Sequence, residues 1–78
     1  MDNTLNKVKS ILAKHLGFSE DNIKENTKLI DDLHADSLDM VEIILALEDK
    51  FSINIPDKAM ESFNTPKDIV NYLKTYYN

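Results

Sequence analysis

Apolar residues recur every three or four positions over three stretches of the chain, the spacing of helices with one buried face. The first stretch predicts a helix over about 4–15, with Gly17 as the glycine that ends it. The second predicts a helix over about 38–51. The third begins at Thr65-Pro66-Lys67-Asp68, where a threonine N-cap, a proline in the first turn and an acid three residues after the cap are typical of a helix start. Its buried face is expected to consist of Ile69, Val70, Leu73 and Tyr76.

The segments between these helices predict one more helix and one long loop. A short helix over about 58–62 is expected after Ile55-Pro56-Asp57. Residues 18–36 form a connection longer than most loops of compact domains, so we expect an ordered loop with a short helical turn after Ser19 or Asp21. Its apolar anchors are expected to be Phe18, Ile23, Leu29, Ile30 and Leu33. No strand-like alternation of useful length is present. The pattern therefore predicts an all-α fold: a small bundle of three main helices plus one short helix, with a long loop between helices one and two.

The helix over 38–51 carries two apolar stripes. At about 100° per residue, one arc wide enough to face a core contains Met40, Ile43, Ile44, Leu47 and Phe51. A second stripe lies on another side of the helix and consists of Leu38, Val41 and Leu45, flanked by Glu42, Glu48 and Asp49. The second stripe either contacts the long loop or the short helix, or it forms a docking surface whose carboxylates attract basic partners.

The size and composition of the chain bound its organisation. Residues 1–78 are expected to form a single domain. Cysteine is absent, which excludes disulfides and Cys-ligated zinc. No apolar run approaches the about 20 residues that span a membrane, and Met1-Asp2-Asn3-Thr4 lacks the basic start of a signal peptide. We therefore expect a cytoplasmic protein, or an organellar protein whose presequence has been removed.

Charge is distributed unevenly along the chain. Fourteen acidic residues stand against nine lysines, for a formal net charge of −5, which disfavours nucleic acid as a partner. Between Leu29 and Asp49 there is no lysine. The acids of this block are Asp31, Asp32, Asp36, Asp39, Glu42, Glu48 and Asp49. Such a block predicts fast, salt-sensitive association with basic proteins.

Ser37 stands at the expected start of the second helix, inside the acidic block. A serine or aspartate at this place is ordinarily a helix cap, and the local pattern alone favours that role. The same place suits a phosphorylated serine, because the backbone N–H groups and the helix dipole stabilise an anion. Capping by Asp36 or Ser37 and attachment of a phosphodiester are compatible with each other.

The string Asp-Asp-Leu-His-Ala-Asp-Ser-Leu-Asp-Met-Val-Glu, residues 31–42, closely resembles the attachment site of acyl carrier proteins. The resemblance covers nearly the whole chain and includes Ala46-Leu47-Glu48, Phe51, Ile55-Pro56-Asp57 and a terminal helix near Asn71-Tyr72-Leu73. It implies a carrier protein rather than an enzyme, similar to the discrete carriers of bacterial-type fatty acid synthesis. Such a carrier holds growing fatty acyl chains as thioesters on a covalent 4'-phosphopantetheine arm and presents them to fatty acid synthesis enzymes.

The same resemblance assigns roles to individual residues. Ser37 would carry the 4'-phosphopantetheine, and Asp36 would help the transferase to recognise the site. The partner surface would consist of Leu38, Val41, Glu42, Leu45, Glu48 and Asp49. The core that shelters the acyl chain would be lined by Ile43, Ile44, Leu47 and Phe51. The implied partners of the monomeric carrier are a holo-synthase (phosphopantetheinyl transferase), a malonyl transferase, ketoacyl synthases, reductases, a dehydratase and acyltransferases with basic docking patches. No catalytic or metal-ligating residue is implied.

His34 departs from the family, which usually has glycine at this position. If the backbone there has a positive φ, histidine costs on the order of 1 kcal/mol relative to glycine, although it tolerates the left-handed region better than most residues. The departure puts the shape of the loop in question. His34 is either an exposed loop histidine without a role, or a group that contacts the phosphate or an enzyme when it is protonated.

The same residues can be considered for a catalytic relay and for a calcium site. His34, Asp36 and Ser37 lie too close together at a helix start for a serine–histidine–carboxylate relay, so hydrolase activity is not expected. An EF-hand loop that begins at Asp31 would have apolar residues at ligand positions, so no dedicated metal site is expected beyond weak binding of divalent ions. Two alternatives stay open: an acidic helical interaction domain in which Ser37 is only a cap, and a polyketide or aminoacyl carrier with the same fold.

Overall fold

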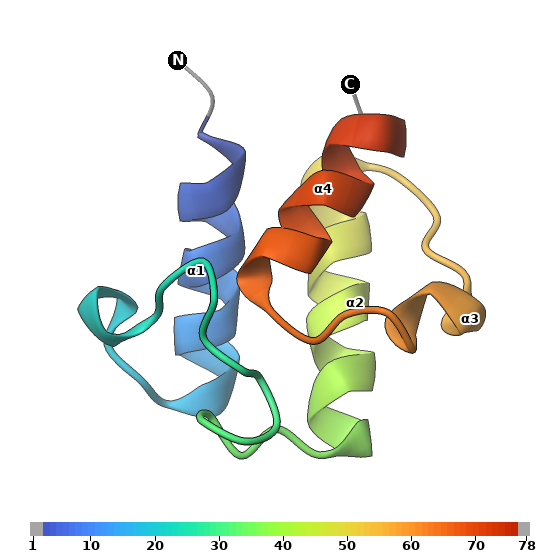
Figure 1. Ribbon diagram of the computed structural model, residues 1–78. Helices are drawn as coiled ribbons and strands as arrows, with labels where there is room; N and C mark the ends of the chain where they lie inside the picture. Colours follow the sequence, from blue (N-terminus) through green and yellow to red (C-terminus); the bar gives the residue numbers. More distant parts are fainter. Residues whose placement is uncertain (1–2, 77–78) are drawn as a thin grey trace.

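The computed structural model describes residues 3–76 (Figure 1). Its elements in chain order are α1 (Thr4–Leu16), the short 3-10 helix η1 (Glu20–Asn22), α2 (Ser37–Phe51), α3 (Asp57–Met60) and α4 (Pro66–Tyr76). Within the described range there is no strand, and three main helices accompany one short helix, so the expected all-α fold is confirmed. In that range no helix combines the length and apolar character needed to cross a membrane.

Local capping sets the ends of the helices. α1 ends before Gly17, whose φ of 78° lies in the left-handed region and whose N–H donates to the carbonyl of Ala13 (2.9 Å). At the start of α4, the N–H of Asp68 donates to Oγ1 of Thr65 (3.3 Å) and the N–H of Thr65 donates to Oδ2 of Asp68 (3.1 Å). The expected helix start at Thr65 is therefore confirmed as a capping box.

The three main helices enclose one core. α1 and α2 run antiparallel, α4 lies across them on one face, and α1 contacts both of the others (Figure 1). Val8 and Leu12 of α1, Leu47 of α2 and Ile69 and Leu73 of α4 have no exposed surface. The expected core stripe of α2 is confirmed, because all five of its members are buried: Met40, Ile43, Ile44, Leu47 and Phe51.

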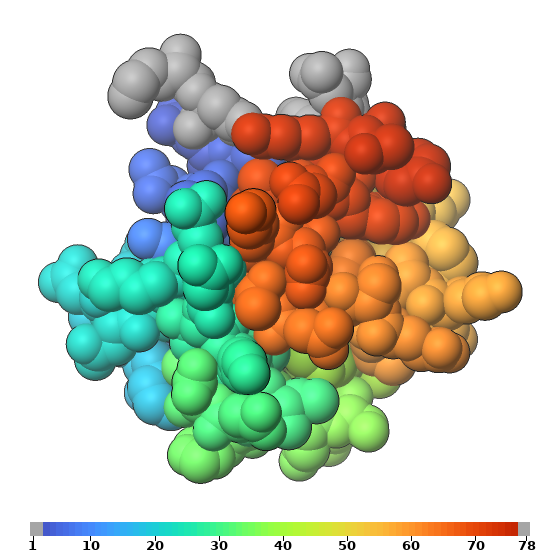
Figure 2. Space-filling view, in the orientation of Figure 1, coloured from blue at the N-terminus to red at the C-terminus, as the bar shows by residue number. Residues whose placement is uncertain are grey.

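The long connection over 18–36 is ordered, as expected. Its short helical turn is η1, where Oγ of Ser19 accepts from the N–H of Asp21 (3.3 Å). Ile23, Leu29 and Leu33 are buried anchors. The loop is hydrogen-bonded to the segment that leads into α4, and Figure 2 shows the two segments side by side on one face of the molecule.

Two residues expected in the core are exposed instead. Ile30 exposes 60% of its surface, and Tyr76 exposes 67%. Ile30 follows Leu29 in a turn, and of the two side chains only that of Leu29 is buried in the core. Tyr76 lies in the last turn of α4 and stacks on Tyr72 outside the core, with ring centroids 4.6 Å apart. Burial at the end of a helix depends on a neighbouring element, which periodicity does not reveal.

Candidate functional site

Asp36 caps α2 and leaves Ser37 as the first helical residue. The N–H of Asp39 donates to Oδ1 of Asp36 (2.8 Å), and the N–H of Asp36 donates to Oδ2 of Asp39 (3.0 Å). The two aspartates thus satisfy each other's backbone groups in a capping box. Ser37 is exposed, and within residues 3–76 its hydroxyl has no hydrogen-bond partner. The site therefore presents a serine hydroxyl that the fold does not need.

The surroundings of Ser37 suit an attached anionic group. The first turn of a helix of 15 residues offers backbone N–H groups and the positive end of the helix dipole. Beside Ser37 lies an open hollow of about 490 Å³ that is bordered by Ser37 itself. An exposed hydroxyl, a helix N-terminus and adjacent space together fit a phosphodiester with a flexible arm.

A left-handed turn leads into the site. His34 has a φ of 60°, its N–H donates to the carbonyl of Ile30 (3.0 Å), and the N–H of Ala35 donates to the carbonyl of Leu29 (2.9 Å). The positive φ considered for this position is therefore present, and the side chain of His34 is exposed. Histidine occupies a turn that glycine would adopt without strain. The loop keeps this turn although its residue is histidine.

The second stripe of α2 is exposed to solvent. Leu38 exposes 66% of its surface, Val41 45% and Leu45 58%. Neither the long loop nor α3 covers these side chains, which removes the alternative in which the stripe is a packing contact. Exposed apolar groups in a row on one helix are typical of an interaction site. Glu42 and Asp49 are exposed beside them.

Glu48 differs from the other acids expected on this surface. It is half-buried, and its Oε2 accepts a hydrogen bond from the N–H of Ile55 (2.7 Å) in the segment before α3. Glu42 has a weaker link to α1, where its Oε1 lies 3.9 Å from Nδ1 of His15. The structure thus gives Glu48 a structural contact that sequence reasoning missed, because a bond to a residue seven positions later depends on how the chain turns after α2.

The residues expected to line an acyl pocket are buried in the core and do not border the hollow. Ile43 and Leu47 have no exposed surface, Ile44 exposes 6% and Phe51 2%. Met40, which exposes 5%, borders the hollow next to Ser37 and precedes them on the same face of α2. The part of the chain that the structure describes holds no cluster of three or more His, Asp or Glu side chains that could bind a metal ion.

Comparison with known proteins identifies the family. Residues 6–73 match the family described as "Phosphopantetheine attachment site". An "Acyl carrier protein" of Zymomonas mobilis subsp. mobilis is 42% identical over 73 residues, which are 94% of each chain. An "Acyl carrier protein" of Clostridium acetobutylicum is 49% identical over 70 residues, which are 90% of this chain and 91% of the relative. The chain belongs to the acyl carrier protein family.

The fold agrees with this assignment. A solved structure of an acyl carrier protein from Enterococcus faecalis matches with a TM-score of 0.79 at 33% identity, over 94% of this chain and 92% of the other. Acyl carrier proteins are carriers and not enzymes, their cofactor is 4'-phosphopantetheine, and the general role of the family lies in fatty acid synthesis. Each of these three expectations from the sequence is confirmed. The alternative of an interaction domain without a cofactor is excluded.

Proposed function

We propose that residues 1–78 form one acyl carrier domain in which Ser37 is the attachment serine. The observation that carries the proposal is the capping box of Asp36 and Asp39, because it relieves Ser37 of capping and leaves its hydroxyl exposed. During loading, the Ser37 oxygen forms a bond to the phosphorus next to the pantetheine of coenzyme A. The bond from that phosphorus to the adenosine bisphosphate leaving group breaks, and the hydroxyl proton passes to a base of the transferase.

Asp36 supports this reaction in two ways. Its Oδ1 accepts from the N–H of Asp39, so the carboxylate fixes the backbone on which Ser37 stands. The side chain of Asp36 is exposed, so its second carboxylate oxygen can accept from a basic group of the transferase. The proposed recognition role of Asp36 therefore combines positioning of the serine with a charge that the enzyme contacts.

The attachment is tested by intact mass after incubation with coenzyme A, magnesium and a phosphopantetheinyl transferase. The native sequence is expected to gain one phosphopantetheine, and Ser37→Ala is expected to gain none. Ser52→Ala is the matched control, because Ser52 is another exposed serine at an end of α2. A full gain in Ser37→Ala would contradict the assignment.

We further propose that the exposed stripe of α2 is the partner surface. The proposed partners are the transferase that installs the arm and the malonyl transferase, ketoacyl synthases, reductases, dehydratase and acyltransferases of fatty acid synthesis, meeting a carrier monomer in the cytoplasm. Apolar side chains supply contact area, and the acids beside them attract basic patches at rates that fall with salt. Glu48 contributes charge from a side chain that is already bonded to Ile55. The proposed surface consists of Leu38, Val41, Glu42, Leu45, Glu48 and Asp49.

Charge reversal tests this surface. Asp49→Lys is expected to lower the second-order rate constant of malonyl transfer several-fold at low salt and to weaken its salt dependence, because a rim charge acts mainly on association. Asp57→Lys makes the same change of charge at an exposed acid of α3 and serves as the control. Equal effects of the two substitutions would show that only net charge matters, which would contradict a localised surface.

The buried face of α2 supports a place for the acyl chain. Ile43, Ile44, Leu47 and Phe51 are close-packed, so the helices must separate slightly to admit an acyl chain among them. We propose that these four residues line that space. Met40, which borders the hollow beside Ser37, belongs to the same buried face of α2 and supports this proposal.

A further inference from the structure

Two open hollows meet close to Ser37, and they share two residues. One, of about 490 Å³, is bordered by Ser37 and Met40 of α2 and by Phe63 after α3. The other, of about 390 Å³, lies over the junction of the long loop with the segment that precedes α4. Ile30 and Asn64 border both hollows. They therefore form the ridge between the attachment serine and the second hollow.

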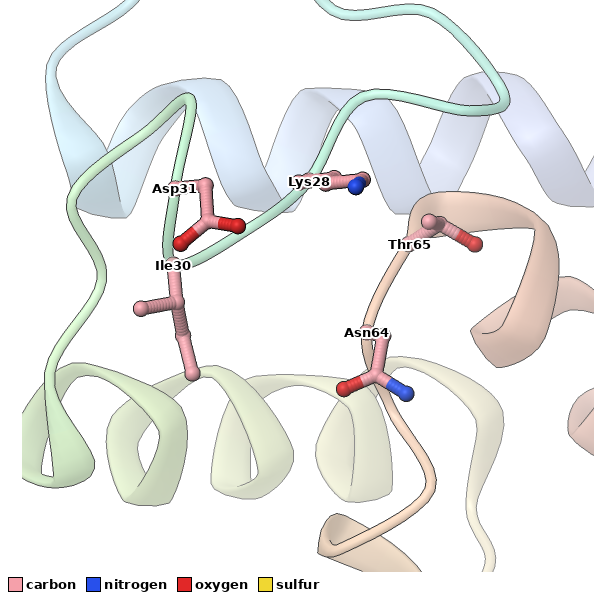
Figure 3. A pocket seen from close by; sticks show the side chains of 5 residues that line it. All are labelled: Lys28, Ile30, Asp31, Asn64 and Thr65. Atoms are coloured by element: carbon pink, nitrogen blue, oxygen red, sulfur yellow. The ribbon is translucent and has the colours of Figure 1, made fainter.

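Ile30 is an apolar side chain that the fold leaves without a partner in the core. It exposes 60% of its surface, whereas its neighbour Leu29 is fully buried. Figure 3 shows Ile30 pointing from the long loop toward the first turns of α2, away from Lys28 and Asp31. Its methyl groups thus border the space next to Ser37, where an apolar group could cover them.

Asn64 supplies the polar half of the ridge. Its side chain extends from the opposite segment in the same direction as Ile30 (Figure 3). Within residues 3–76 its side-chain amide makes no hydrogen bond, whereas its backbone is fully used: the N–H donates to Oδ2 of Asp68 (3.0 Å) and the carbonyl accepts from the N–H of Leu29 (2.9 Å). A side-chain amide offers both a donor and an acceptor to a ligand.

The ridge is held in place before any ligand arrives. The bond from Leu29 to Asn64 joins the two segments directly beside Ile30, and the N–H of Lys67 donates to the carbonyl of Glu25 (3.0 Å) further along. The left-handed turn at His34 closes the loop behind Ile30. A preformed surface loses little conformational freedom on contact, which favours even a weak tethered ligand.

We propose that Ile30 and Asn64 form a cradle against which the phosphopantetheine arm on Ser37 rests when no partner enzyme is bound. This inference rests on the proposed attachment at Ser37. The arm carries a carbon with two methyl groups and two amides, so its chemistry matches an exposed isoleucine beside an unoccupied amide. Because the arm is attached at the rim of the hollow, its effective concentration there is on the order of millimolar, and weak contacts suffice.

The experiment uses isotope-labelled protein loaded from unlabelled coenzyme A, with complete loading verified by intact mass. Isotope-filtered NOEs then report contacts from the arm to the protein. We expect NOEs from the methyl protons of the arm to the methyl groups of Ile30, and a shift of the side-chain NH₂ signals of Asn64 relative to the unloaded protein. Leu45 serves as the internal control, because it exposes 58% of its surface and lies eight residues from Ser37 along α2, about 12 Å along the helix axis.

Substitutions test whether the arm rests specifically on Ile30 and Asn64 or moves freely over the surface. Ile30→Ser and Asn64→Ala are each expected to sharpen the signals of the arm and to remove its NOEs to the ridge. Tyr76→Ser, a change at an exposed side chain outside the proposed partner surface, should leave both unchanged. Complete loading without NOEs to Ile30, and with unshifted Asn64 signals, would overturn the cradle and leave the attachment at Ser37 intact. If native protein fails to gain mass with a transferase that loads another carrier, the attachment itself is wrong, and the cradle with it.

Discussion

The bond between Glu48 and the N–H of Ile55 yields the sharpest prediction on stability. Ile55 exposes only 4% of its surface, so in Glu48→Ala its N–H loses an acceptor in a place that water reaches poorly. A hydrogen bond to a charged group contributes about 1.5–3 kcal/mol, and the better helix propensity of alanine returns about 0.4 kcal/mol. Because Glu48 is only half-buried, we expect the lower part of this range, a loss of about 1–2 kcal/mol.

This loss is large for a chain of this size. A domain of 78 residues has a free energy of unfolding of roughly 4–12 kcal/mol. Each kcal/mol shifts the Tm of such a domain by about 4–8 °C, so a loss of 1.5 kcal/mol predicts a fall of roughly 6–12 °C. Amide exchange at Ile55 should accelerate along with it, because the donor is no longer engaged.

Urea denaturation of three variants provides the assay. Glu48→Gln keeps an acceptor at the same place and is expected to lose about half as much as Glu48→Ala, because neutral hydrogen bonds are roughly half as strong as charge-assisted ones. Asp49→Ala, the exposed neighbour, should change the free energy of unfolding by no more than about 0.5 kcal/mol. Equal stability of Glu48→Ala and Asp49→Ala, with unchanged exchange at Ile55, would refute the reasoning.

Two further predictions concern His34 and Tyr72. In urea denaturation, His34→Gly should leave the free energy of unfolding unchanged or raise it by up to about 0.5 kcal/mol, because relief of the left-handed strain is partly offset by the greater freedom of glycine in the unfolded chain. His34→Val should lower the free energy of unfolding by about 1 kcal/mol or more. Equal stability of the two variants would contradict backbone strain at this position. Burial, with smaller contributions from Tyr76 and Glu48, raises the pKa of Tyr72 above its usual value of about 10. The stability that Tyr72 contributes is therefore fully present below about pH 10 and is lost as the pH rises through the folded-state pKa. The part of the alkaline absorbance titration that disappears in Tyr72→Phe should therefore have a midpoint above 10, and a midpoint at or below 10 would contradict the raised pKa.

Periodicity predicted the helical core well, because each helix must turn one face inward. The five buried residues of α2 follow directly from a repeat of 3.6 residues. The same geometry placed Leu38, Val41 and Leu45 on a second face, but their exposure depends on which elements pack there, and the structure decides it. The capping residues at Thr65 and Gly17 were also predictable, since each acts on backbone groups within its own helix. Local rules suffice wherever the partners are close in sequence.

Loops and long-range contacts were less predictable for a physical reason. In the long loop, composition alone placed Ile30 in the core, but the turn that buries Leu29 turns Ile30 outward. Glu48 looked like one more surface acid, because its bond to Ile55 requires the chain to reverse at Ser52, whose φ is 56°. The choice of Asp36 over Ser37 as the cap likewise depends on which side chain reaches the N–H of Asp39.

Localisation of the added group by tandem mass spectrometry tests the central claim most directly. The chain offers five serines to the transferase: Ser10, Ser19, Ser37, Ser52 and Ser62. Fragmentation of the loaded protein is predicted to place the whole added mass on Ser37, whose hydroxyl is exposed and is not needed to cap α2. An added mass on any other serine, or spread over several, would contradict the account.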